Sequence, residues 1–187
     1  DTMLNEIKKD AQARMGKSID ALRHTLIKLR TGRASAAIVD HLKVNYYGSE
    51  VPLSQVASVA VTDARSITIT PWEKQMVGPV EKAILASDLG LTPNTAGTVI
   101  RLNIPALTEE RRRDLSKVVH SEGEDAKVAI RNIRRDGNHQ VKELLKDKQI
   151  TEDEASRTEA EIQKITDGAI RDVDEVVRAK EAELMAV

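Results

Sequence analysis

The chain of 187 residues is long enough for one domain or two with a buried core, and because phenylalanine is absent this core must be aliphatic. Charged residues make up 32% of it, as in proteins with long exposed helices, and the net charge of −1 combines a basic N-terminal region with an acidic C-terminal one. The absence of cysteine excludes a disulfide framework and a thiolate site, while the absence of a signal peptide and of a long apolar run predicts a soluble cytoplasmic protein.

Residues 4–29 have the pattern of one long amphipathic helix. Apolar residues recur there close to the a/d spacing of a helical bundle: Leu4, Ile7, Ala11, Met15, Ile19, Leu22, Leu26 and Leu29. The pattern stops at residues 31–35, where Gly32 frees the backbone.

Residues 38–104 instead predict a small β-rich domain with one helix. The expected strands are residues 41–47, 56–61, 66–70 and 98–104. Residues 75–87 read as a short helix and residues 94–97 as a loop. Trp72 follows Pro71, and we expect it to be a packing anchor rather than a stacking platform.

Two further helices complete the chain. Residues 108–148 contain no proline and would span about 60 Å as a helix, and residues 151–154 have the spacing of a capping box that opens the next one. Their apolar stripes are Leu115, Val119, Ala126, Ile130, Ile133, Val141 and Leu144 in one, and Ile162, Ile165, Ala169, Val173, Val176 and Leu184 in the other. Gly123, Gly137 and Gly168 interrupt these helices at up to ~1 kcal/mol each, and close helix approach is the expected reason.

This order predicts an α+β fold in which three long helices form one elongated bundle. The bundle would comprise residues 1–30 and 106–187, with residues 31–105 inserted between its first two helices. A double connection restricts relative motion to a hinge, whose expected residues are Thr31, Gly32, Arg33, Ala34, Ile104, Pro105 and Ala106.

Charge is sorted around the second long helix. Basic and amide residues fall along one flank of its apolar stripe, namely Lys127, Arg131, Arg134, Arg135, Asn138 and Lys142. Most acids fall on the other flank or behind it, namely Asp114, Asp125, Asp136 and Glu143, with Glu124 as the exception. Aligned arginines bind phosphates, and without aromatic neighbours they would recognise a nucleic-acid backbone rather than splayed bases. The alternative interpretation is a solvated face with pairing inside the helix.

The sequence contains no arrangement typical of catalysis. There is no phosphate-binding glycine loop and no nucleophile beside a base, and the four histidines lack metal-ligand spacing. We therefore expect no catalytic residue, no metal and no cofactor.

Several segments together resemble the bacterial ribosome recycling factor family, in the same order along the chain. They are residues 29–35 (LRTGRAS), 46–48 (YYG), 80–84 (VEKAI), 87–91 (SDLGL), 107–112 (LTEERR) and 128–136 (VAIRNIRRD). The resemblance implies an L-shaped, tRNA-sized protein in which a β/α/β domain is inserted after the first helix of a three-helix bundle. It also implies that the chain enters the ribosome after termination and, with elongation factor G and GTP hydrolysis by that partner, splits the subunits.

In this family the bundle lies against large-subunit ribosomal RNA, chiefly through arginines of the second long helix, while the hinge and smaller domain face the elongation factor. Those arginines match Arg131 and Arg134 here. The candidate RNA-binding residues are therefore Arg131, Arg134, Arg135, Arg112, Lys127, Arg30 and Arg33.

The alternative function is a helical scaffold or adaptor that binds no RNA. Such a protein would not need the charge-sorted helix and would be expected to self-associate through its seams. We instead expect a monomer, without a DNA or membrane partner, because three helices can cover each other's seams.

Overall fold

The computed structural model describes residues 2–29 and 31–186. The described chain divides into two compact units, one built from residues 2–29 and 109–186 and the other from residues 31–108. The first is a three-helix bundle and the second a small sheet domain with one helix, which confirms the predicted α+β fold class. None of the helices within the described ranges is long and apolar enough to cross a membrane.

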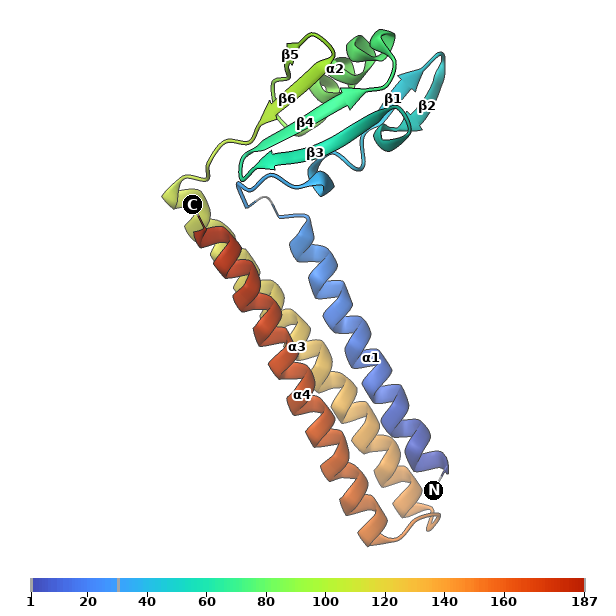
Figure 1. The fold of residues 1–187 in the computed structure, drawn as a ribbon. Helices are drawn as coiled ribbons and strands as arrows, with labels where there is room; N and C mark the ends of the chain where they lie inside the picture. Colours follow the sequence, from blue (N-terminus) through green and yellow to red (C-terminus); the bar gives the residue numbers. More distant parts are fainter. Residues whose placement is uncertain (1, 30, 187) are drawn as a thin grey trace. The chain divides into compact units, whose positions relative to one another are not determined.

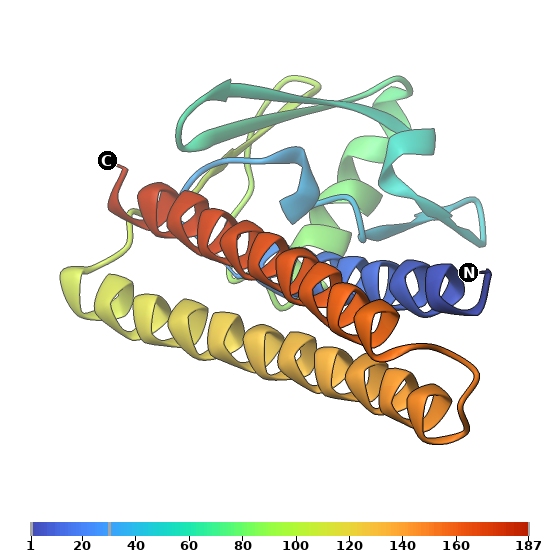
Figure 2. The same ribbon diagram turned by 90° about the horizontal axis from the view of Figure 1, so that it is seen from below.

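The bundle consists of three long helices that lie side by side (Figures 1 and 2). They are α1 (Thr2–Ile27), α3 (Glu109–Lys146) and α4 (Glu152–Met185). Most residues of the expected apolar seams are buried between them, and Met15, Ile130 and Ile162 are almost fully covered. Leu29, expected at the end of the first seam, lies beyond the end of α1 and is half-buried. In α4 the seam steps from Val173 to Val177 rather than to the expected Val176, because Val177 packs over a glycine of α3.

The start of α4 carries the capping box that its sequence predicts. The Thr151 hydroxyl accepts a hydrogen bond from the Glu154 N–H, and the Thr151 N–H donates to the Glu154 carboxylate, each over 3.1 Å. The Thr151 N–H, and the Thr151 hydroxyl, which also donates to the Glu154 carboxylate over 3.1 Å, lower the pKa of Glu154 because they favour its charged form. The cap lies where the first turn of α1 meets the connection between α3 and α4 (Figure 1), and Leu4 packs there against Ile150.

Close helix approach explains one of the three glycines that interrupt the long helices. A Cβ at Gly123 would lie 2.6 Å from Val177 Cγ2, and one at Gly137 would lie 3.4 Å from Ile162 Cδ1. At Gly168 the nearest atom is a guanidinium nitrogen of Arg171 at 3.7 Å, in the same helix. Packing therefore requires glycine at Gly123, whereas a Cβ at Gly137 or Gly168 would make only ordinary van der Waals contact.

The second unit combines a β-hairpin with a four-stranded antiparallel sheet of order β3-β4-β6-β5. The elements are β1 (Lys43–Tyr46), β2 (Ser49–Pro52), β3 (Ala57–Asp63), β4 (Ser66–Pro71), α2 (Val77–Ala86), β5 (Asn94–Ala96) and β6 (Val99–Asn103). Short 3₁₀ helices occupy Ala36–Ile38, Leu53–Gln55 and Lys74–Met76. Ile67, Ile100 and Val80 are fully buried in its core, to which the sheet and α2 both contribute.

Two expectations for this unit are wrong. Residues 94–97 are not all loop, because Gly97 adopts φ +64° and closes a tight hairpin in which β5 pairs with β6. Trp72 is 64% exposed and is not a packing anchor. Burial alternates along β4 and places Pro71 inward, so the residue that follows is directed away from the core.

Both connections to the bundle are tied to the turn between β3 and β4. The Ala34 N–H donates to the Ala64 carbonyl and the Ile104 N–H to the Arg65 carbonyl, each over 2.7 Å. Gly32 has φ +77°, and a Cβ there would lie 3.1 Å from Leu107 Cγ. The two connections therefore pack against each other within the second unit.

Candidate RNA-binding face of helix α3

The basic residues of α3 lie at different angles around the helix, and therefore at different distances from α4. At ~100° per residue from the buried Ile130, Arg134 lies at about 40°, Arg131 at about 100° and Arg135 at about 140°. Arg134 and Arg131 are half-buried and Arg135 is exposed. The three arginines thus fan out from the α3–α4 boundary towards solvent, and we call them the arginine face.

One acid on the opposite flank, Asp136, faces α1. Its carboxylate forms an ion pair with Arg14 of α1 over 3.1 Å. Because this carboxylate is engaged across the other helix boundary, it does not neutralise the arginine face. Asp136 thus has a partner on α1, whereas Lys127 and Arg134 have partners on α4.

The ammonium of Lys127 is not free to bind a phosphate in the way that the sequence suggested. Its ammonium lies 2.6 Å from the Asp174 carboxylate of α4 and 3.6 Å from Glu124, and its side chain is only 17% exposed. The hydrogen bond with Asp174 raises the pKa of Lys127 by stabilising its charged form. The structure thus places Lys127 in a bridge between helices, where its charge is largely compensated.

Arg134 is held by α4 through a neutral side chain. Its NH1 donates to Gln163 Oε1 over 3.2 Å, and Gln163 Nε2 in turn donates to Asp167 Oδ1 over 2.8 Å. The Nε of Arg134 is buried and has no hydrogen-bond partner among the described residues. The guanidinium is therefore bonded to a neutral amide, and no carboxylate among the described residues pairs with it.

Arg131 and Arg135 complete the arginine face. Within the described part of the chain, Arg131 forms no hydrogen bond and no ion pair. Arg135 donates to Asn132 Oδ1 over 3.1 Å, a contact with a neutral residue one turn back. No carboxylate pairs with any of the three arginines in the described ranges, so their donors and charge are directed to solvent.

The structure places two of the remaining predicted residues. Arg112 is half-buried near the start of α3, and Arg33 is exposed in the second unit. Arg30 lies outside the described residues. The structure therefore brings together Arg131, Arg134 and Arg135 on one surface, and Lys127 beside them in an ion pair.

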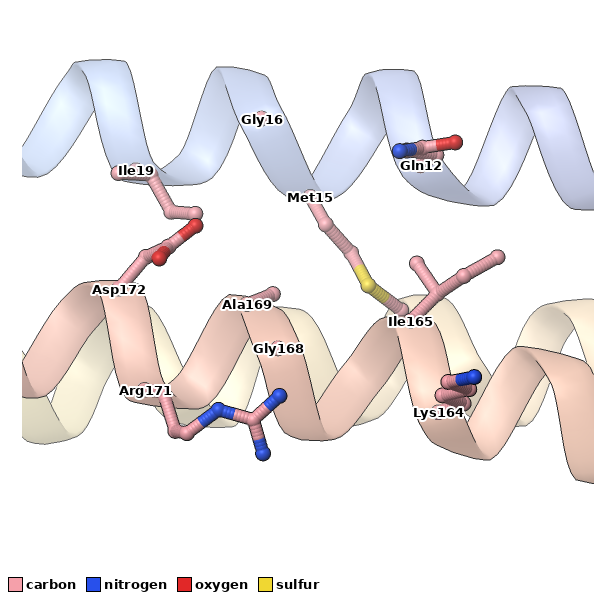
Figure 3. A pocket seen from close by; sticks show the side chains of 10 residues that line it. All are labelled: Gln12, Met15, Gly16, Ile19, Lys164, Ile165, Gly168, Ala169, Arg171 and Asp172. Carbon is pink, nitrogen blue, oxygen red and sulfur yellow. The ribbon is translucent and has the colours of Figure 1, made fainter.

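Open cavities lie between helices of the bundle, and two of them are formed by described residues. One of about 410 Å³ lies between α1 and α4, where Gly16 and Gly168 lack side chains. Figure 3 shows Met15 extending across it towards Ile165, while Arg171 points away from α1. The other, of about 320 Å³, contains the Lys127–Asp174 pair. No cluster of three or more acidic or histidine side chains in the described chain is arranged to hold a metal ion.

Comparison with known proteins identifies the family. The sequence model of the ribosome recycling factor family matches residues 22–185. The chain belongs to this family. The ribosome-recycling factor of Xanthomonas campestris pv. campestris (strain B100) is 68% identical over 185 residues, which cover 99% of this chain and 100% of that one.

Solved structures of ribosome recycling factors share the fold. A solution structure is 40% identical, with a TM-score of 0.77 and 98% of each chain covered. The T. thermophilus ribosome recycling factor is 46% identical, with a TM-score of 0.64 and coverage of 98% of this chain and 99% of that one. That protein is placed, together with E. coli elongation factor G, on the E. coli post-termination complex.

Sequence reasoning missed the contribution of α4 to the recycling-factor bundle's polar surface. Gln163, Asp167 and Asp174 contact or support the basic residues of α3, yet all three read as ordinary surface positions. The sequence did contain a signal for this contribution, because His120, Lys127 and Arg134 are spaced by seven residues. Residues seven apart lie on the same edge of a helix and can face the same neighbouring helix. The helix pairing is needed to interpret it.

Proposed function

We propose that the chain binds the ribosome left on messenger RNA after termination and, with elongation factor G, splits it into subunits that can initiate again. Membership of the ribosome recycling factor family supports the general role. The arrangement of the T. thermophilus relative with elongation factor G on a post-termination complex supports the partners. Because ribosomes are the target, the proposed place of action is the cytoplasm.

The arginine face is the observation that carries the RNA-binding part of the proposal. Three guanidinium groups lie together without a carboxylate partner among the described residues, so their attraction for phosphate is not cancelled locally. Arginine presents a planar fork of donors that matches phosphate oxygens. A ribosomal RNA backbone on this face would be held by shape and charge rather than by base stacking.

Catalysis in this scheme belongs to elongation factor G, which hydrolyses GTP, so the chain itself is not proposed to be an enzyme. Its proposed contribution is to bind the ribosome, with the double connection at residues 31–34 and 104–106 acting as a hinge. It would act as a monomer, because Met15, Ile130 and Ile162 are covered within one bundle. Stable self-association in light scattering would instead favour the scaffold alternative.

A subunit-splitting assay tests the proposal. Post-termination ribosomes are mixed with elongation factor G, GTP and the chain, and subunit release is followed by light scattering. We expect Arg134→Ala to lose most of its splitting activity while its far-UV circular dichroism is unchanged, because alanine and arginine are both good helix formers.

The matched control is Arg23→Ala. It removes the same charge from α1, where Arg23 forms only an exposed pair with Asp20 of the kind that contributes little. Equal loss of activity in both variants would mean that net charge, and not the arginine face, matters.

A further inference from the structure

Arg134 is restrained from two sides before any ligand binds. Its Nε is buried, and its NH1 is bonded to Gln163 Oε1 on the facing helix. A guanidinium is planar, so the hydrogen bond to NH1, together with the packing around the buried Nε, limits how far the plane can rotate and leaves the NH2 edge unbonded. That edge is the part left to meet a phosphate.

Asp167 determines which end of the Gln163 amide faces Arg134. A glutamine amide has one acceptor end and one donor end, and only the acceptor end can bond to a guanidinium. A carboxylate can only accept, and Asp167 Oδ1 takes the hydrogen bond from Gln163 Nε2 over 2.8 Å. The carboxylate thereby turns Oε1 of the amide towards Arg134.

We propose that Gln163 and Asp167 are positioning residues that hold Arg134 of the arginine face ready for a phosphate, an inference that rests on the proposed function. Neither residue needs to touch RNA. Gln163 restrains the arginine without neutralising it, in contrast to Asp174, which pairs directly with Lys127. Restraint before binding reduces the conformational freedom lost on binding, which is the origin of the gain in affinity.

This inference makes a prediction opposite in sign to simple electrostatics. Asp167→Asn removes a negative charge from the surface beside the arginine face, and Coulomb attraction alone would then bind phosphate more tightly. An asparagine can donate as well as accept, so it no longer fixes the Gln163 amide, and Arg134 loses its restraint. Positioning therefore predicts weaker binding.

The test measures the dissociation constant for post-termination ribosomes over a range of salt concentrations. Gln163→Leu and Asp167→Asn are compared with wild type, each also in an Arg134→Ala background. The control is Glu175→Gln, which removes the same charge from an exposed position of α4 that forms no hydrogen bond or ion pair within the described residues. Far-UV circular dichroism and thermal melts confirm that every variant retains the bundle.

We expect Gln163→Leu and Asp167→Asn to bind about 2- to 10-fold more weakly than wild type, the range for losing one immobilised side chain. Glu175→Gln should bind as tightly as wild type or more tightly. The salt slope should not change in the two positioning variants, because the number of phosphates contacted stays the same. In the Arg134→Ala background neither substitution should weaken binding further, and Asp167→Asn should be neutral or slightly tighter, as expected from the charge it removes.

Equal or tighter binding by Asp167→Asn would overturn the inference, as would a penalty that persists without Arg134. The proposed function fails separately: if Arg134→Ala binds ribosomes as wild type does, the arginine face loses its central contact. If Arg134→Ala weakens binding while Gln163→Leu and Asp167→Asn do not, only the positioning role is wrong.

Discussion

Gly123→Ala should destabilise the bundle, although alanine is the better helix former. A Cβ at this position of α3 would lie 2.6 Å from Val177 Cγ2, far inside van der Waals contact. Val177 is buried in α4 and is β-branched, and such a side chain has one strongly preferred χ1 rotamer in a helix. It cannot turn aside cheaply, so the helices must separate.

The expected magnitude follows from two opposing terms. Alanine gains about 1 kcal/mol over glycine in a helix interior, whereas overpacking a well-filled core costs typically about 1–3 kcal/mol. The net result is a loss of roughly 0–2 kcal/mol for Gly123→Ala, with a central value near 1 kcal/mol. Gly168→Ala is the matched control, because its Cβ would meet nothing closer than 3.7 Å. It should stabilise the bundle by up to about 1 kcal/mol.

Urea unfolding followed by circular dichroism at 222 nm measures these differences, since the long helices supply most of the signal. Fluorescence of Trp72, which lies in the second unit, follows the sheet domain separately. The double variant Gly123→Ala/Val177→Ala removes the clashing methyl and should cost less than the sum of its single substitutions. If Gly123→Ala stabilises the chain as much as Gly168→Ala does, the argument from close approach is wrong.

Three further predictions concern the cap, the ion pair and the connection. Thr151→Ala should cost about 1 kcal/mol of stability at neutral pH. Hydrogen bonds lower the pKa of Glu154 from its ordinary 4.5, so the cap is fully effective above that pH and weakens as the pH falls through the lowered pKa. The stability difference between Thr151→Ala and wild type, measured by unfolding at a series of pH values, should therefore shrink in acid. Lys127→Ala should lower thermal stability, because it removes the ion pair with Asp174. It should change the salt slope of ribosome binding less than Arg131→Ala does, and an equal change would show that Lys127 contacts a phosphate despite this ion pair. Gly32→Val should impair subunit splitting while the helices remain folded. A backbone φ of +77° strains a β-branched residue, and the added Cβ would crowd Leu107 in the second connection. Normal splitting would show that glycine is not required there.

The helices were predictable because each long helix repeats its apolar residues with a period that only a buried face explains. In α1, the expected Leu4, Met15 and Leu26 are all buried. The capping box of α4 was equally clear, since it is a local pattern. Local and periodic features of this kind need no knowledge of the partner element.

Features that depend on a neighbour were not predictable in the same way. Gly123 and Gly168 look alike in the sequence, and only the position of Val177 shows that one is required by packing and the other is not. Lys127 and Arg134 fall on the same flank of α3, but one faces a carboxylate of α4 and the other an amide. The direction of an exposed aromatic such as Trp72 depends on strand register, which a single sequence does not reveal.

The salt dependence of ribosome binding tests the central claim, that the arginine face binds ribosomal RNA phosphates, most directly. Dissociation constants of wild type, Arg131→Ala and Arg134→Ala are measured by co-sedimentation with ribosomes at graded salt, with Arg23→Ala as the charge-matched control. Each substitution on the face should reduce the magnitude of the slope of log affinity against log salt by roughly 0.7–0.9, as expected for one lost phosphate contact. Wild-type affinity and slope in Arg131→Ala and Arg134→Ala would contradict the account.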